Sequence, residues 1–180
     1  MRLMGFRPRK LETEDQLYDC AVALLARRMR TIAELKTLLR GKVDGETEIG
    51  RTLVRLVIRR LKDQGYLNDA KYAAAYSSFR RDNEKFGPRR VVADLKAKGV
   101  HREIIDQIVD STFQEVDEEK QAREYLRRKR SKKPRDRKEA ARVFRQLFRA
   151  GFGAKTIFRI LRRWDVDEEM LDELEGNLQD

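Results

Sequence analysis

The chain has 180 residues, of which 40% are hydrophobic and 41% charged, and its 42 Lys and Arg residues against 31 Asp and Glu give a net charge of +11. This balance excludes one large apolar core and favours small units that bury their apolar faces against neighbouring units. The excess of positive charge indicates a polyanionic or acidic partner, and the longest apolar run, seven residues, is too short to span a membrane.

The chain has one cysteine, Cys20, and one histidine, His101. A single cysteine cannot form an intrachain disulfide, and one Cys with one His is too few for a usual zinc site. The basic N-terminus is not followed by a signal-peptide core. We therefore expect a cytoplasmic protein without metal or cofactor, and no association with a membrane.

The first 69 residues predict a mobile basic arm followed by three helices. Residues 1–11 are basic, lack periodicity and are interrupted by Pro8. A helix is expected from about Asp15, and Thr31 to Glu34 forms a capping box that opens the second. A glycine-rich loop at 41–50 precedes a third amphipathic helix that ends at Gly65. We interpret residues 12–69 as the first helical repeat.

The next segment predicts a second set of three helices, in residues 70–116. Gly65 ends the preceding helix in a left-handed conformation, and an aromatic stripe follows on the next helix, with Tyr72 and Phe79 seven residues apart. Tyr66, Tyr72, Tyr76 and Phe79 are interpreted as core residues, with stacking on nucleic-acid bases as the alternative. Gly87-Pro88 is a joint between helices, because proline suits the first position of a helix.

The third repeat, residues 117–165, is predicted from a self-match of the sequence at a shift of 52 residues. Gly99 then pairs with Gly151, and Leu95 with Leu147. The pairing continues through the following helix. In the preceding helix, Tyr76 matches Tyr125 at a shift of 49 residues and not 52. The connection between the two helices is therefore about three residues longer in the third repeat, which indicates an inserted basic loop near 130–135.

Charge is strongly separated at the C-terminal end. Residues 120–163 contain 18 basic and three acidic residues, a net charge of +15, whereas residues 164–180 contain eight acids and no Lys or Arg. A short helix is expected in the acidic tail, 166–180. Two interpretations stay open for this tail: a brake that folds back on the basic repeat, or a solubilising terminal helix.

The basic residues of the third repeat are the main candidates for binding a partner or a nucleic acid, because they are dense and have few compensating acids. A smaller candidate group lies on the helix that begins at Pro88. The candidates are Arg127, Arg128, Lys129, Arg130, Lys132, Lys133, Arg135, Arg142, Arg145, Arg149, Lys155, Arg159, Arg162 and Arg163, with Arg89, Arg90, Lys96 and Lys98.

No glycine-rich phosphate loop, nucleophile elbow or metal triad is present, so we expect no catalytic residues and no enzyme. One alternative function comes from residues 148–157, which resemble the turn and recognition-helix start of a helix-turn-helix DNA reader. Nonspecific contact with single- or double-stranded DNA is also possible as an accessory to protein binding.

One stretch resembles the central signature of the RecX family, bacterial regulators of the RecA recombinase. The matching residues, in order, are Gly65-Tyr66-Leu67-Asn68-Asp69, Tyr72-Ala73, Arg80, Gly87-Pro88-Arg89-Arg90 and Lys98-Gly99-Val100. Asp94 and Val100 depart mildly from the family pattern, where glutamate and isoleucine are common. The resemblance implies a non-catalytic protein that binds the RecA nucleoprotein filament and inhibits its growth, ATPase and strand exchange.

Together these patterns predict an all-α chain, an elongated tandem array of three three-helix repeats. The resemblance adds the partner, a RecA-type recombinase filament, and a role in modulating recombination, DNA repair and the SOS response. We expect a monomer. The alternative is a helix-turn-helix-like protein that acts on DNA directly.

Overall fold

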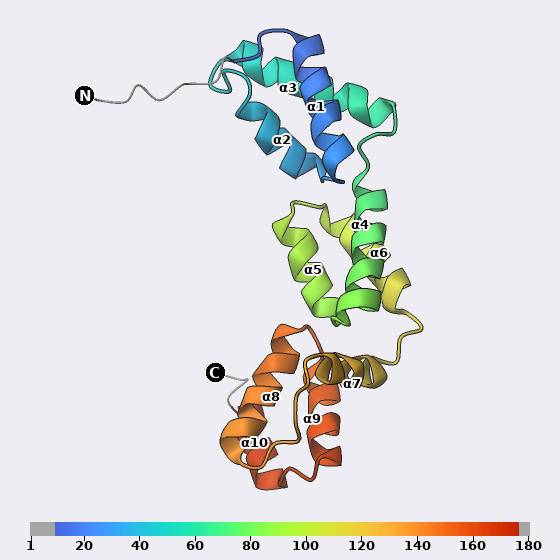
Figure 1. Ribbon diagram of the computed structural model, residues 1–180, viewed down its shortest axis with the longest axis vertical. Helices are drawn as coiled ribbons and strands as arrows, with labels where there is room; N and C mark the ends of the chain where they lie inside the picture. Colours follow the sequence, from blue (N-terminus) through green and yellow to red (C-terminus); the bar gives the residue numbers. More distant parts are fainter. Residues whose placement is uncertain (1–9, 177–180) are drawn as a thin grey trace, which may run out of the picture. The chain divides into compact units, whose positions relative to one another are not determined.

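The structure, a computed structural model, describes residues 10–176, and every regular element in that range is a helix (Figure 1). The all-α prediction is confirmed. The N-terminal helices are α1 (Glu14–Arg27), α2 (Ile32–Arg40) and α3 (Glu48–Asp63). The middle of the chain contains α4 (Asp69–Phe79), the π-helix η1 (Arg80–Glu84), α5 (Pro88–Ala97) and α6 (Arg102–Phe113). The C-terminal helices are α7 (Glu118–Arg128), α8 (Arg137–Arg149), α9 (Ala154–Arg163) and α10 (Glu168–Gly176).

The chain divides into two compact units. Unit 1 contains the described residues up to 72 together with 98–101, and unit 2 contains 73–97 and 102–176. Both units therefore take part of the expected second repeat. The expected arm, 1–11, lies outside the described residues except for Lys10 and Leu11, and the repeat boundaries remain a prediction.

Unit 1 is built on α1, α2 and α3, which contact one another in pairs. Each of the three helices begins with a threonine cap, and the capping box between Thr31 and Glu34 is formed as the sequence predicts. Their apolar faces meet in one core. Its buried members are Leu17, Ala21, Leu35, Leu39, Val43, Val54, Val57, Ile58, Leu61 and Leu67.

The turn at 98–101 packs on the start of α2. The Thr31 hydroxyl donates to the Lys98 carbonyl oxygen at 2.7 Å, and the Lys98 ammonium pairs with Glu34 at 3.1 Å. The Asp69 carboxylate accepts from the Ile32 amide at 2.8 Å. Burial raises the pKa of Asp69, although the Ile32 amide acts in the opposite direction.

Unit 2 has its core among the last four helices, where α9 contacts α7, α8 and α10. The buried members of this core are Ala122, Tyr125, Leu126, Val143, Phe144, Leu147, Ala150, Phe152, Ile157, Phe158, Ile160, Leu161 and Leu171. The partly buried Trp164 packs against it. Leu171 belongs to α10, so the acidic tail contributes an apolar side chain to the unit's core.

The Gly87-Pro88 joint makes direct backbone contact with the turn after α8. The Gly87 amide donates to the Ala150 carbonyl at 2.9 Å, and the Arg89 amide donates to the Gly151 carbonyl at 3.3 Å. Gly151 has φ +92, in the left-handed region, and a Cβ there would lie 2.2 Å from the Arg90 nitrogen. The start of α5 therefore docks on the end of α8, where a side chain on either glycine would collide with backbone.

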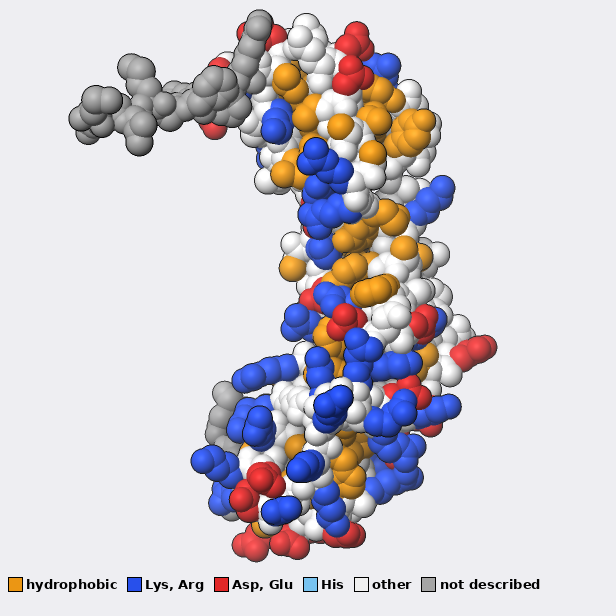
Figure 2. Space-filling view, in the orientation of Figure 1, with side chains coloured by type: hydrophobic (Ala, Val, Ile, Leu, Met, Phe, Trp, Pro, Cys, Tyr) orange, Lys and Arg blue, Asp and Glu red, His pale blue; other side chains and the backbone are white. Residues whose placement is uncertain are grey.

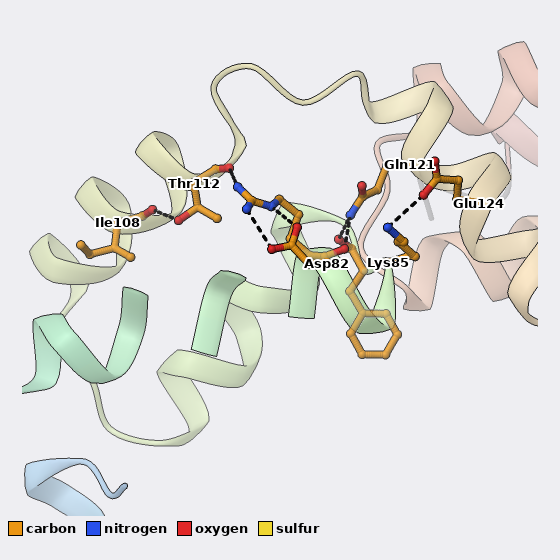
Figure 3. A network of polar contacts seen from close by, with 8 residues as sticks. Asp82, Lys85, Ile108, Thr112, Gln121 and Glu124 are labelled. Carbon is orange, nitrogen blue, oxygen red and sulfur yellow. Dashed lines mark hydrogen bonds and ion pairs between the residues drawn. The ribbon is translucent and has the colours of Figure 1, made fainter. Parts of the chain in front are cut away.

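A polar network also holds α6 and α7 to η1 and the residues that follow it (Figure 3). The Arg81 guanidinium donates to the Thr112 carbonyl at 2.7 Å and pairs with Asp82, while the Gln121 amide donates to the carbonyls of Arg81 and Phe86. This network was not predicted from the sequence, because a single side chain that donates to a distant backbone carbonyl produces no periodic pattern of residues.

Two of the aromatic residues interpreted as core are exposed. Tyr72 is buried, but Tyr66 is 67% and Phe79 53% exposed. Phe79 lies two residues after the fully buried Ser77, and so on nearly the opposite side of α4 from it. Ile49, in the first turn of the amphipathic helix α3, is 73% exposed, while Val43 in the preceding loop is buried in the core.

Candidate nucleic-acid or protein interface

A third of the basic residues predicted as candidates converge at one groove of unit 2, with a volume of about 780 Å³. The groove lies along the end of α7, the following loop and one face of α8. Six of the candidates line it: Lys129, Arg130, Lys132, Arg142, Arg145 and Arg149. Figure 2 shows that Lys and Arg side chains gather on the visible face over α7 to α9.

The six groove cations are exposed, and within residues 10–176 none of them forms an ion pair with a carboxylate. The described lining includes one acid, Glu139, whose carboxylate accepts from the Arg135 amide at 2.9 Å. Like charges in a concave surface reinforce one another's potential. The groove is therefore suited to an anionic ligand or an acidic protein surface.

Uncharged polar groups complete the groove. The Ser131 hydroxyl donates to the Gln146 side-chain oxygen at 3.1 Å, and the Lys129 ammonium lies 5.8 Å from the centre of the Tyr125 ring. Burial raises the pKa of the Tyr125 phenol, while its hydrogen bond with Gln146 acts in the opposite direction. Tyr125 and Gln146 were not among the predicted site residues. Tyr125 was matched to the core residue Tyr76, and Gln146 is uncharged, whereas only Lys and Arg were selected as candidates.

The candidate arginines of α9 face a buried carboxylate instead. Glu119 at the start of α7 has a side chain only 9% exposed, and it lies 2.7 Å from Arg163, 3.5 Å from Arg159 and 3.4 Å from Arg123. The Arg163 contact is close but poorly directed, since the same carboxylate oxygen lacks a well-aligned hydrogen bond. Much of the α9 charge is therefore compensated inside the protein.

The neighbouring acid, Glu118, occupies the start of α9. Its carboxylate accepts from the Gly153 amide at 2.9 Å and from the Thr156 hydroxyl. A carboxylate at a helix N-terminus satisfies free amides and is favoured by the helix dipole. The first turn of α9, the one that a helix-turn-helix protein would present to DNA, is thus already held by an acid.

The remaining candidates do not line the groove. Three of them have ion-pair partners: Arg162 with Glu168 of α10 at 2.9 Å, Lys133 with Asp165 at 2.7 Å, and Arg90 with Asp94 at 3.0 Å. Lys98 lies in unit 1, half-buried and paired with Glu34. The exposed candidates that lie outside the groove lining and form no ion pair within residues 10–176 are Arg127, Arg128, Arg135, Lys155, Arg89 and Lys96.

Across residues 10–176, no three His, Cys, Asp or Glu side chains are grouped so that they could hold a metal ion. None of the helices in that range is long and apolar enough to cross a membrane.

Comparison with known proteins places this geometry in a family. Residues 68–108 match the family model described as RecX, second three-helix domain. The Regulatory protein RecX of Pseudomonas putida is 30% identical over 158 residues, which cover 88% of this chain and 97% of that protein. The chain belongs to the RecX family. The RecX of Cronobacter sakazakii is 31% identical, over 84% of this chain and 93% of its own length.

Other RecX proteins are longer. The chain spans 58% of the Bacillus pumilus protein, with 31% identity. Among solved structures, a regulatory protein RecX aligns with a TM-score of 0.64 at 22% identity over 83% of this chain and 71% of that one. The RecX of Lactobacillus salivarius aligns with a TM-score of 0.63 at 21% identity, over 84% and 96% of the two chains. The RecX fold is thus shared at low sequence identity.

Proposed function

We propose that this RecX protein regulates a RecA-type recombinase by binding the recombinase's nucleoprotein filament and inhibiting its growth, ATPase and strand exchange. The observation that supports the binding surface is the groove of unit 2, where six exposed cations stand together without internal ion pairs. Membership of a family whose members are named regulatory proteins supports the regulatory role.

The groove concentrates the charge that remains free. The arginines of α9 are held by Glu119 and Glu168, whereas the six groove cations at the end of α7, in the following loop and along α8 form no ion pair within residues 10–176. A filament offers both acidic protein surface and DNA phosphates to such a groove. Several moderate contacts made by one chain along a repetitive filament add to high avidity without any single tight site.

Direct action on DNA by a helix-turn-helix is the competing function. The turn between α8 and α9 is occupied by the start of α5, and the first turn of α9 is capped by Glu118. An acid at that position repels phosphates and takes up the amides that a DNA-reading helix would direct at the backbone. These contacts argue against sequence reading by this turn.

Binding to preformed filaments tests the proposal. The protein should co-sediment with RecA-type filaments at amounts of DNA too small to retain it alone, and added free DNA should not release it. The variant Arg142→Glu/Arg145→Glu should bind less. The double variant Lys71→Glu/Arg102→Glu makes the same charge change on exposed residues outside the groove and should bind as the parent does. Release by free DNA in proportion to its amount would instead identify a DNA competitor.

A further inference from the structure

Unit 1 contains a second concave surface, of about 280 Å³, between α2 and α3. Ile32 and Ile58 provide its apolar surface, and Ile58 is nearly buried. The charged side chains around them are four cations and one acid: Lys36, Arg55, Arg59, Lys62 and Asp63. An apolar centre with a charged rim is the usual organisation of a protein interface.

Most of the rim charge is available to a partner. Within the described residues, no carboxylate forms an ion pair with Lys36, Arg59 or Lys62. Arg55 pairs with Glu48 at 3.1 Å, but both side chains are more than 60% exposed, so that pair is weak and readily exchanged. The rim therefore carries a net positive charge that the fold itself does not use.

The size and chemistry of this pocket distinguish between classes of ligand. Its volume is below the roughly 300 to 1,000 Å³ of a usual small-molecule site, so it suits one or two side chains of a longer segment. Single-stranded nucleic acid binds by stacking bases on aromatic rings, and the pocket lining consists of aliphatic and charged residues. A phosphate backbone would leave the two isoleucines uncovered.

We propose that the α2–α3 pocket binds an acidic amphipathic peptide segment of a partner protein, with apolar side chains over Ile32 and Ile58 and carboxylates on the surrounding cations. Helical grooves commonly bind such segments through apolar residues one turn apart, with charge setting the partner's identity. This site is separate from the basic groove of unit 2, and the inference does not rest on the proposed function.

The test uses a fluorescein-labelled peptide with two leucines one helical turn apart and glutamates at most other positions, and measures its anisotropy on the full-length protein. The peptide should bind, and the versions with leucines changed to alanine or glutamates changed to glutamine should each bind less. The variant Lys36→Glu/Arg59→Glu should weaken binding about tenfold or more, because close charge pairs across an interface are lost and reversed. Lys71→Glu, an exposed residue of the same unit outside the pocket lining, is the control, with half the charge change of the double variant.

Three results would overturn the proposal. One is absence of peptide binding at low ionic strength, and a second is equal binding by Lys36→Glu/Arg59→Glu with unchanged circular dichroism. The third is displacement of the peptide by a labelled thymidine oligonucleotide whose own binding is lost in that variant, which would assign the pocket to phosphates. Recombinase inhibition is measured separately, so its failure does not bear on this site.

Discussion

The substitution Gly87→Ala should damage unit 2 by breaking the docking of α5 on the end of α8. A Cβ on Gly87 would lie 2.4 Å from the Gly151 carbonyl oxygen and 2.6 Å from its carbon, which are backbone atoms that cannot rotate away. Overpacking of this kind costs about 1 to 3 kcal/mol. The Gly87 and Arg89 amides also lose well-placed acceptors, each worth about 1 kcal/mol net.

The expected loss is therefore about 3 to 5 kcal/mol, and a urea slope of about 2 kcal/mol per molar converts this to a midpoint shift of about 1.5 to 2.5 M. The assay is urea unfolding followed by the fluorescence of Trp164, the chain's single tryptophan, which packs on the core of unit 2. The control is Gly153→Ala. A Cβ there would have its nearest neighbour at 3.5 Å, so we expect a loss of about 1 kcal/mol or less, from its helix-cap position.

A Gly87→Ala midpoint within about 0.3 M of the parent, or a Gly153→Ala loss as large as that of Gly87→Ala, would refute the reasoning. The first result would mean that the backbone at the Gly87-Pro88 joint can move to accommodate a Cβ with little loss of stability. The second would mean that glycine is needed in this region for a reason other than close backbone approach.

Three further predictions follow from the contacts of unit 2. Leu171→Ala should destabilise unit 2 by about 2 to 4 kcal/mol in the same assay, since this α10 side chain is 1% exposed in the core, whereas Glu169→Ala on the exposed face should have little effect. Glu119→Gln should lower the urea midpoint and raise the affinity for anions, because it releases three arginines from one buried carboxylate; an unchanged affinity for heparin would argue against that neutralisation. Acid should weaken unit 2, because Arg81 lowers the pKa of Asp82 and Lys85 lowers that of Glu124. Carboxylates with depressed pKa values stabilise the fold above their ordinary titration range, so the Trp164 midpoint should fall as pH drops from about 5 to about 3, and a flat profile would contradict this.

The contribution of Leu171 changes how the acidic tail must be studied. Removing residues 166–180 would take away Leu171 together with the acids, so a change in binding would mix lost stability with lost charge. The contact of Glu168 with Arg162 is compatible with a tail that shields basic residues. Changing exposed acids of α10 to glutamine separates the brake from the solubilising interpretation, and this question remains open.

Local signals predicted much of the fold. The capping box at Thr31, the glycine at 65 and the Gly-Pro joint each depend on a few adjacent residues, and all three features are present. The 52-residue match is reflected in the left-handed conformations of Gly99 and Gly151. The exposure of Phe79 was missed because the spacing of the aromatic residues suggested one buried stripe, whereas the buried face of α4 includes the small residues Ala73 and Ser77.

The candidate site was predicted less completely. A run of basic residues identifies charge, but the charge left free depends on which acids pack beside it. Glu119 is eight residues before Arg127 in sequence, yet it pairs with Arg159 and Arg163 on α9. The groove residues Gln146 and Tyr125 come together only through the packing of α7 on α8 and α9, which no local pattern reports.

The central claim, that this RecX protein inhibits a RecA-type recombinase through the groove of unit 2, is tested most directly by DNA-dependent ATPase. The recombinase is assembled on single-stranded DNA and titrated with the parent protein, with Arg142→Glu/Arg145→Glu and with the control Lys71→Glu/Arg102→Glu. We expect the parent and the control to inhibit at amounts well below that of the recombinase, and the groove variant to lose inhibition while keeping its helical content. Full inhibition by the groove variant would contradict the assigned surface, and no effect of the parent at any ratio would contradict the function itself.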